Sequence, residues 1–592
     1  MTTSDEKIHS AGRNIQEKAA LIWNVANTLF GAFKPHEYGL VILPMVVVKR
    51  FHDCLLPTHQ AVLDAYRRVE RLAVKDGFLR EASGYQFYNT SPFTFETLRA
   101  DPENVNENFR AYLNGFSDNV QDILARMSFN AQIERMAEAG LLYQVIVDFC
   151  SEKADMSPDK ISAVDMGYIF ENLVQRFSES YNEEAGAHFT SRDIIYLMCD
   201  CLVTGDSAAF RGDGISKTVY DMTMGTSQML TCMEERLKQL DADADVTVFG
   251  QELNPFTFGI AKADMLIRGG DPDNMQFGNT LDDDKFEGYQ FDIAISNPPF
   301  GIDWKREAPK VEKEYKKGIA GRFSPGLPSK SDGQMLFLLN GLSKLKADGR
   351  MAIIQNGSSL FTGDAGSGQS EIRRYLIEND WLDAIVQLPN DSFYNTGIAT
   401  YIWLIAKEKP ESHVGKVQLI DASKCYEPRR KPIGNKRVDI TETCRNLIVR
   451  AYGEYRDAEY ADASADGKTR MVCKSRVVDS VSLGYYKIAV ESPALDENGQ
   501  PIMKNGKPVM DKDTETVPLD EDIDAYFKRE VFPYNPKAKI VKSKTKVGYE
   551  IPFTRTFYEF KEVEPADEIA KRIEEHERSL MEKLRNLFGK TD

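Results

Sequence analysis

Apolar residues recur at intervals of three to four through the first 165 positions of the chain, which is the pattern of helices with one buried face. Few glycines or prolines interrupt segments such as GLLYQVIVDFCSEKA. We therefore predict that residues 1–165 form a helical N-terminal domain.

From about residue 186 the pattern changes to short β-rich runs with helical stretches between most of them. The runs are KTVYDM, DVTVFGQEL, QFDIAISN, RMAIIQN, WLDAIVQL and TYIWLIAK. This alternation is typical of a doubly wound α/β sheet. Because the pattern weakens after about residue 420, we predict an α/β domain over residues 166–420.

The rest of the chain is predicted to form an extension over 421–560 and a helix over 561–592. Within the extension, ESPALDENGQPIMKNGKPVMDKDTE contains Asn-Gly twice and indicates a hairpin or loop insertion. The final helix begins near Pro565 and has a narrow apolar stripe formed by Ile569, Ile573, Leu580, Leu584 and Leu587. Such a stripe favours packing on the same protein or on a partner over membrane binding.

Composition agrees with a soluble protein of several domains, since 592 residues exceed the size of a single core. No apolar run approaches the ~20 residues that cross a bilayer, and the longest, GLVILPMVVVKR, is broken by Pro44. The eight cysteines include no CxxC pair, and the seven histidines are dispersed. We therefore expect reduced thiols, no metal site and a cytoplasmic location.

The formal net charge of −17 argues against a chain that grips nucleic acid over its whole surface. Basic residues nevertheless gather in three segments, at 305–330, 424–437 and 536–548. Each segment is either a solvated loop of an acidic protein or a local contact for an anionic partner.

The most specific motif is FDIAISNPPFG, in which a predicted buried strand ends at Asn297. Ligands of open α/β sheets bind at the carboxyl ends of strands. Pro298 and Pro299 stiffen the turn that follows, and Phe300 adds a flat apolar face. The amide oxygen of Asn297 and the carbonyl of Pro298 are two acceptors in a rigid turn, which suits a planar exocyclic amine.

An aryl amine is a poor nucleophile because its lone pair is delocalised into the ring. Hydrogen bonds accepted from both N–H groups concentrate electron density on the nitrogen and hold it for in-line attack. The alternative interpretation is a Pro-Pro turn that closes a buried strand, with Asn297 as an ordinary turn residue.

Upstream of this turn, VYDMTMGTSQML has the outline of a strand–turn–helix nucleotide loop, although it contains one glycine where such loops usually carry two or three. Glu252 ends the next predicted strand, where a carboxylate can accept from ribose hydroxyls. Asn279 follows a third short run, where an amide can read an adenine edge. The alternative for Glu252 is a solvated loop residue.

These motifs resemble those of the S-adenosylmethionine-dependent DNA adenine-N6 methyltransferases. AGAHFTSRDIIYLM, at residues 185–198, resembles the motif of that family that contacts the methionine end of the cofactor. Its position before the loop and NPPF is the order called the γ class. The resemblance extends over nearly the whole chain to the modification (M) subunit of type I restriction-modification systems, from NVANTLFGAFKPHEYGLVILPMVVVKRFHD to KVGYEIPFTRTFYEF.

The resemblance implies a Rossmann-like S-adenosylmethionine-dependent methyltransferase domain with a helical N-terminal domain and a C-terminal extension ending in a helix. It implies that the NPPF residues bind an adenine flipped from the duplex. It also implies that Glu252 holds the ribose and that Asn279 lies by the cofactor's adenine. The cofactor-binding residues implied are Phe189, Thr190, Asp221, Met222, Gly225, Thr226, Ser227, Glu252 and Asn279.

The chain departs from the family's usual loop, Asp-Pro-x-x-Gly-Thr-Gly-Gly, at three positions: Met222, Ser227 and Gln228. The loss of the second glycine matters if that position needs positive φ, where serine costs ~1–2 kcal/mol. S-adenosylmethionine has no pyrophosphate, so close backbone approach is less demanding than in a dinucleotide site. We therefore predict weakened rather than abolished cofactor binding.

The predicted function is site-specific DNA adenine-N6 methylation with S-adenosylmethionine. One alternative is an amine methyltransferase acting on RNA or on protein glutamine, which leaves the helical front and the long tail unexplained. Another is a non-catalytic or cofactor-weakened assembly subunit that kept the fold while the loop drifted. Cytosine-C5 chemistry is not indicated, because the chain has no Pro-Cys pair.

The resemblance also implies partners: a specificity (S) subunit that chooses the DNA sequence, a second M subunit, and a restriction (R) subunit. The basic segment after the catalytic turn is predicted to face double-stranded DNA, and reversal of Lys316 and Lys317 is expected to weaken DNA binding. The residues predicted to contact DNA are Lys305, Arg306, Lys316, Lys317 and Arg322.

Overall fold

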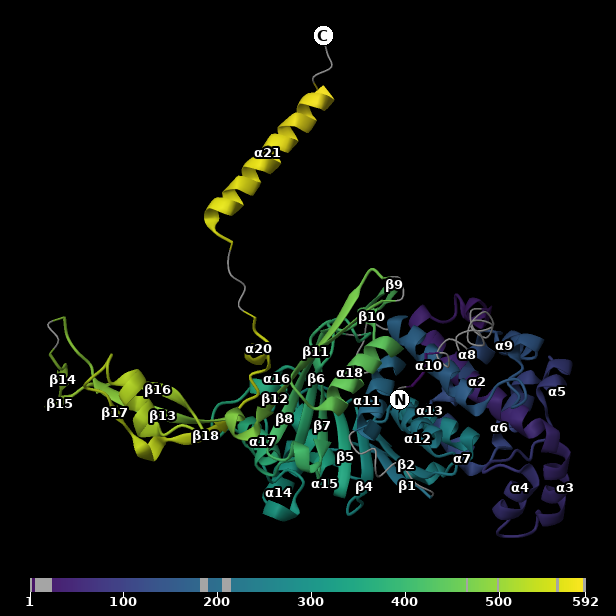
Figure 1. Ribbon diagram of the computed structural model, residues 1–592. Helices are drawn as coiled ribbons and strands as arrows, with labels where there is room; N and C mark the ends of the chain where they lie inside the picture. Colours follow the sequence, from purple (N-terminus) through teal and green to yellow (C-terminus); the bar gives the residue numbers. More distant parts are fainter. Residues whose placement is uncertain are drawn as a thin grey trace. The chain divides into compact units, whose positions relative to one another are not determined.

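The computed structural model describes residues 3–5, 24–180, 190–204, 214–394, 396–464, 467–497, 500–559 and 564–588 (Figure 1). The chain divides into two compact units, Met1–Ile551 and Pro552–Asp592, and each is described by itself. No helix in the described ranges has both the length and the apolar composition needed to cross a membrane.

The N-terminal part of the first unit is helical, as predicted. The helices are α2 (Tyr38–Leu55), α3 (His59–Val69), α4 (Asp76–Ser83), α5 (Phe95–Ala100), α6 (Val105–Asn114), α7 (Asp118–Arg126), α8 (Phe129–Glu138), α9 (Leu142–Phe149) and α10 (Ala163–Ser180). They form a separate block beside the sheet (Figure 1). Their shared apolar core extends to Ile260 and Leu266 of α13 (Pro255–Arg268), so this block is packed onto the α/β domain.

The α/β domain is built on a ten-stranded sheet with the order β11-β12-β8-β6-β7-β5-β4-β1-β2-β3. The strands are β1 (Ser216–Asp221), β2 (Asp245–Glu252), β3 (Met275–Phe277), β4 (Phe291–Ser296), β5 (Leu345–Asn356), β6 (Leu382–Gln387), β7 (Thr400–Ala406), β8 (Lys416–Lys424), β11 (Ala458–Ala463) and β12 (Arg470–Asp479). Strand β7 is antiparallel to both β5 and β6, whereas β1 to β5 pair in parallel. All six β-rich runs of the predicted domain are strands of this sheet.

The predicted domain boundaries at residues 165 and 420 both fall inside secondary-structure elements. The boundary at residue 420 falls inside β8, and β11 and β12 continue the sheet beyond it to Asp479. The boundary at residue 165 falls in the first turn of α10. The sheet extends because β12 pairs with β8 over most of its length, a contact between segments that no local pattern relates. The predicted division at residues 165, 420 and 560 stays a proposal.

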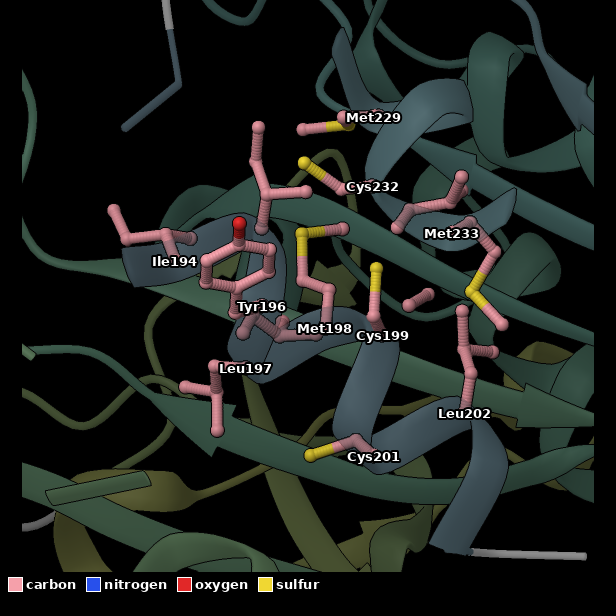
Figure 2. Packing of buried hydrophobic residues seen from close by; sticks show 14 of the residues in the cluster. Ile194, Tyr196, Leu197, Met198, Cys199, Cys201, Leu202, Met229, Cys232 and Met233 are labelled. Atoms are coloured by element: carbon pink, nitrogen blue, oxygen red, sulfur yellow. The ribbon is translucent and has the colours of Figure 1, made fainter. Parts of the chain in front are cut away.

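The helices of this domain are α11 (Arg192–Thr204), α12 (Gln228–Leu240), α13, α14 (Ala308–Tyr315), α15 (Gln334–Ser343), α16 (Ser358–Phe361), α17 (Gly368–Glu378) and α18 (Glu442–Glu454). Helix α11 is buried from Arg192 to Val203. Figure 2 shows its side chains, including Tyr196, Met198 and Cys199, packed against Met229 and Cys232 of α12. This dense packing gives the residues at the start of α11 a fixed position.

The extension after the sheet contains β13 (Gly484–Pro493), which pairs with β16 (Met510–Pro518), β17 (Lys539–Ile540) and β18 (Lys546–Tyr549). Helix α19 (Ile523–Tyr526) lies between β16 and β17 in the chain. The predicted hairpin is confirmed: β14 (Met503–Lys504) and β15 (Lys507–Pro508) flank Asn505 and Gly506, whose φ values of 52° and 71° fit a tight hairpin turn.

The second unit contains α20 (Phe553–Thr556) and the predicted terminal helix, α21 (Ala566–Phe588). Its apolar stripe is exposed, with Ile573 at 55% and Leu580 at 59% of their full accessible surface. The side chain of Leu587 lies outside the described residues.

Candidate functional site

The predicted site residues from three strands meet at one edge of the sheet. Asp221 ends β1 and Glu252 ends β2, and Asn297 follows the last residue of β4. Because β1 pairs in parallel with both β2 and β4, these three carboxyl ends lie side by side. The edge therefore collects two carboxylates and one amide within a small area, as expected for a ligand site of an open α/β sheet.

The loop after β1 is anchored to β2 through Glu252. The Gly225 N–H donates to Glu252 Oε2 at 2.8 Å, and the Met224 N–H donates to the Gln251 carbonyl at 3.1 Å. Glu252 Oε1 accepts from the Asn254 N–H at 2.7 Å, next to the start of α13. These hydrogen bonds hold the Glu252 carboxylate against the loop, where it is placed to accept from hydroxyl groups of a ligand.

Ser227 occupies the position of the second glycine of the family's loop, and it is left-handed, with φ 65° and ψ 15°. Gly225 is also at positive φ, 55°. The loop therefore keeps the backbone that glycine favours, although serine stands at one of the two positions. The side chain of Ser227 is 1% exposed, and its Oγ has no hydrogen-bond partner among the described residues.

We expect Ser227→Gly to raise the free energy of unfolding by about 1 kcal/mol, because glycine pays no left-handed penalty. Gly225→Ser, at the matching position two residues earlier, should lower it by a similar amount. Thermal or denaturant unfolding of both variants measures the effect. Destabilisation by Ser227→Gly would show that the buried hydroxyl has a structural role that outweighs the strain.

Asp221 also holds the loop after β1 in place through hydrogen bonds. Its Oδ1 accepts from the Ser296 hydroxyl at 2.6 Å and from the Thr223 N–H at 3.0 Å, and the Thr223 and Ser296 hydroxyls are 2.8 Å apart. This network joins the loop after β1 to β4, the strand that precedes Asn297. Burial raises the pKa of Asp221 to about 7, with a contribution from the charge of Glu252, against the hydrogen bonds that favour the ionised form.

The raised pKa of Asp221 predicts a pH-dependent stability. The unfolded chain releases this proton at a lower pH than the folded protein, so the carboxyl removes stability as the pH rises from about 4 to about 7 and has a constant effect above that. Asp221→Asn keeps the accepting Oδ1 without the charge. We expect its stability advantage over the natural protein to grow across this range, by on the order of 1.4 kcal/mol for each unit of pKa difference. A difference in unfolding free energy that is constant with pH would contradict the assignment.

The Asn-Pro-Pro-Phe turn meets the predicted methionine-end motif. Asn297 Nδ2 donates to Thr190 Oγ1 at 2.7 Å, and each of the two residues is 5% exposed. Thr190 lies two residues before α11, so the packing of that helix fixes the hydroxyl that orients the Asn297 amide. Pro298 is buried, while Pro299 and Phe300 are half-buried, and Phe300 packs against the core that includes α11. Phe189 lies outside the described residues.

The remaining predicted cofactor residues differ in position. Asn279 Nδ2 donates to Glu307 Oε1 at 2.9 Å, which ties the third strand end to the segment after the catalytic turn. Met222 is fully buried, with its sulfur 3.5 Å from Asn340 Nδ2, so its side chain belongs to the core beneath the loop. Thr226 is half-buried at the loop itself.

The structure divides the residues predicted to contact DNA into three groups. Lys305 and Arg306 are exposed just after the catalytic turn. Lys317 lines a pocket of about 620 Å³ together with residues 287–290, which precede β4, and Lys344, which precedes β5. On this side the pocket reaches the amino ends of these strands, and six residues of β4 separate that edge from Asn297 by about 20 Å. We therefore remove Lys317 and the adjacent Lys316 from the DNA-contacting set.

Arg322 is also removed from the set, because its guanidinium is partly buried and fully hydrogen-bonded. It donates to Glu314 at 2.8 Å from both Nε and Nη2, and to the Thr280 and Leu281 carbonyls and Asn340 at 2.7, 3.3 and 2.8 Å. These contacts use all five donors. Arg322 thus links the segment after the Asn-Pro-Pro-Phe turn to the connection between β3 and β4.

Several residues at this edge carried no signal in the sequence. Ser296 and Thr223 form the hydroxyl link between the loop and β4, yet short polar residues at strand ends are common in any fold. The pair of Lys436 and Asp193, 2.9 Å apart and distant in the chain, could not be inferred from either segment.

The strand order, with one antiparallel strand between β5 and β6, and an Asn-Pro-Pro-Phe turn at the carboxyl end of β4 together define a Rossmann-like methyltransferase domain. Comparison with known proteins identifies the family. Residues 162–493 match the family described as N-6 DNA Methylase, and residues 18–149 match the HsdM N-terminal domain. The chain therefore belongs to the N-6 DNA methylase family, and the two matched regions confirm its resemblance to the type I modification (M) subunit.

Individual relatives are distant in sequence. The MjaIX methylase subunit of the type I restriction enzyme from Methanocaldococcus jannaschii is 23% identical over 459 residues, which are 74% of this chain and 78% of that protein. The MpnII methylase subunit of Mycoplasma pneumoniae is 25% identical over 301 residues, 49% of this chain, and this chain spans about half (52%) of its length. The solved methyltransferase subunit of a type I system from Streptococcus thermophilus has the same fold, with a TM-score of 0.60 and 23% identity, over 79% of this chain and 97% of that chain.

Proposed function

We propose that this chain methylates the N6 amine of adenine in DNA with S-adenosylmethionine, as the modification subunit of a type I restriction-modification complex. The observation that carries the proposal is the convergence at one sheet edge of Glu252 on the loop of Gly225 and of Asn297 on Thr190. This convergence supports a ribose acceptor, a cofactor loop and an amine-binding turn at neighbouring strand ends.

The residues at the loop fit S-adenosylmethionine. Two of their polar atoms, Ser227 Oγ and Gln228 Nε2, are buried without a hydrogen-bond partner in the described part of the chain, and a cofactor bound at this loop would offer partners to such groups. Glu252 would hold the ribose, Gly225 and Thr226 would shape the loop, and Asn279 would lie by the adenine. Thr190 would face the methionine end. When bound, the cofactor supplies an activated methyl group.

The protein's part in the reaction is to bind, orient and desolvate the target. The Asn297 amide oxygen and the Pro298 carbonyl would accept hydrogen bonds from the two N–H groups of a flipped adenine, and Phe300 would stack on its ring. Because Nδ2 of Asn297 is already committed to Thr190, the amide oxygen is presented in one orientation. The turn therefore holds the amine nitrogen for in-line attack.

We further propose double-stranded DNA, a specificity subunit, a second copy of this chain and a restriction subunit as partners. The exposed apolar stripe of α21, with Ile573 and Leu580 at its centre, is a surface for contact within that complex. Lys305 and Arg306, exposed after the catalytic turn, are proposed DNA contacts.

Two alternatives are separated from this proposal by one experiment. The complex assembled by co-expression is tested for methyl transfer to duplex DNA, and the modified bases are mapped. N6-methyladenine at a defined sequence is the expected result. Methylation of RNA or protein but not DNA would favour the second amine substrate class, and no transfer to any substrate would favour a non-catalytic assembly subunit.

A further inference from the structure

The basic segment 424–437 belongs to neither the proposed cofactor loop nor the Asn-Pro-Pro-Phe turn. It forms a two-stranded hairpin of β9 (Glu427–Ile433) and β10 (Lys436–Asp439), outside the ten-stranded sheet. Figure 1 shows this hairpin projecting beyond the upper end of the sheet, while α14 lies at the lower end. Its place in the domain follows from its contacts.

The hairpin is fastened to the loop that follows β6. The Asn435 and Arg437 N–H groups donate to the Tyr394 and Asp391 carbonyls at 2.7 and 2.9 Å. Strand β6 runs in the same direction as β5 and β4, because β7 is antiparallel to both β5 and β6. The loop after β6 therefore lies at the same edge of the sheet as Asn297.

A second fastening joins the hairpin to the start of α11. Lys436 Nζ lies 2.9 Å from Asp193 Oδ2, and the Ile440 N–H donates to the same oxygen at 2.8 Å. Lys436 is 1% exposed, so this is a buried ion pair with a fixed geometry. Asp193 comes three residues after Thr190, whose hydroxyl accepts from Asn297. The hairpin base is thus within about one helical turn of the residues that hold the catalytic amide.

Gly434 makes this close approach possible. It has φ 55°, and a Cβ at this position would lie 2.4 Å from the Tyr394 carbonyl oxygen. A residue with a side chain would be strained and would push the hairpin away from the loop.

The charges of the hairpin are unbalanced at its surface. Residues 427–439 contain five Lys or Arg and two acidic residues. Arg429 pairs with Asp439, and Lys436 with Asp193. Arg430, Lys431 and Arg437 are exposed, and none of them has an ion-pair partner within the described residues. On a chain of net charge −17, three unpaired cations beside the catalytic edge are a local feature that suits a polyanion.

We propose that hairpin β9–β10 binds the phosphate backbone of double-stranded DNA beside the target base, through Arg430, Lys431 and Arg437. The inference rests on the proposed function and adds a contact surface to it. A base that reaches Asn297 brings its own flanking phosphates to this edge, and flipping requires that the flanking backbone be held. Phosphate contacts fix the register of the duplex without reading sequence, which leaves base readout to another subunit.

The test measures duplex binding by the assembled complex as a function of salt. Each neutralised phosphate contributes about −0.9 to the slope of log K against log salt. The triple variant Arg430→Gln/Lys431→Gln/Arg437→Gln should therefore lower the magnitude of the slope by about 2 to 3 and weaken binding about tenfold or more at physiological salt. The matched control, Lys313→Gln/Lys316→Gln/Lys317→Gln, removes the same charge around the end of α14 and should leave the slope unchanged. The variant Arg430→Lys/Arg437→Lys keeps the charge, so it should also leave the slope unchanged.

An unchanged slope in the hairpin variant, or an equal drop in the α14 control, would overturn the proposal. Loss of subunit assembly by the hairpin variant, measured by sedimentation, would assign the surface to a protein partner and overturn it as well. Failure of the proposed function is seen separately. A natural complex that binds duplex but transfers no methyl group contradicts the enzymatic role, while the slope comparison still decides the role of the hairpin.

Discussion

Replacing Asn297 with alanine should lower the rate of methyl transfer by the assembled complex by about 100- to 1000-fold, the usual effect of removing one preorganised hydrogen-bonding group from a transition state. The side chain is buried and oriented by its 2.7 Å hydrogen bond to Thr190. Its loss removes one of the two acceptors proposed for the adenine amine. The measurement is single-turnover transfer of a labelled methyl group to duplex DNA.

Two further variants make the result specific to chemistry. Thr190→Val removes only the hydroxyl that accepts from Asn297 Nδ2, so it should lower the rate by a smaller factor, about tenfold. Asn379→Ala, at an exposed position after α17, is the matched control and should retain full activity. Affinity for S-adenosylmethionine should change little in Asn297→Ala and Asn379→Ala, which leave the proposed cofactor-binding residues intact. Full activity of Asn297→Ala would mean that the turn is only structural.

Replacing Glu252 with alanine should weaken S-adenosylmethionine binding by about 10- to 100-fold. Hydrogen bonds to a charged group contribute roughly 1.5–3 kcal/mol, and 1.4 kcal/mol corresponds to a factor of ten. Glu252 is proposed to accept from the ribose, and it also anchors the loop through the Gly225 N–H. Both effects act in the same direction. Isothermal titration of the assembled complex with S-adenosylmethionine measures the loss.

The effect of Glu252→Ala should be local. Asn254 caps α13 with its own side chain, which accepts from the Phe256 N–H at 2.9 Å, so the helix start does not depend on Glu252. Glu252→Gln, which keeps one amide oxygen as acceptor, should bind with intermediate affinity. Glu234→Ala on α12, where the half-buried Glu234 pairs with the exposed Lys238, is the matched control. Equal affinity of Glu252→Ala and the natural protein would contradict the ribose assignment.

The effect of Ser227 depends on both the sequence and the backbone conformation. The sequence showed that serine replaced a family glycine, but the consequence depended on whether that position needs positive φ. The observed φ of 65° shows that it does. Backbone conformation at one residue is set by how β1 and α12 are joined, so no local pattern could supply it. Ser227 keeps the left-handed conformation at a cost of about 1 kcal/mol, which is small compared with the stability of a folded domain.

The basic segments show that closeness to Asn297 in the sequence did not predict closeness to it in the fold. Lys316 and Lys317 follow the Asn-Pro-Pro-Phe turn closely in sequence, yet Lys317 lines a pocket that reaches the residues before β4 and β5. The hairpin at 427–439 is 130 residues beyond Asn297 at its start, but the contacts of Lys436 and Asn435 return it to the catalytic edge. Charge alone did not distinguish the two segments.

From the amino-acid order follow the elements and their chemistry: six strands of the sheet, the helical front, the Asn505–Gly506 hairpin, and the residues that end strands β1, β2 and β4. These depend on periodicity and turn preferences, which act within a few residues. The order of the strands, the antiparallel β7, the Asn297–Thr190 bond across 107 positions and the Lys436–Asp193 pair across 243 appear only in the folded chain. Such contacts depend on register and packing between distant segments, which short-range pattern does not encode.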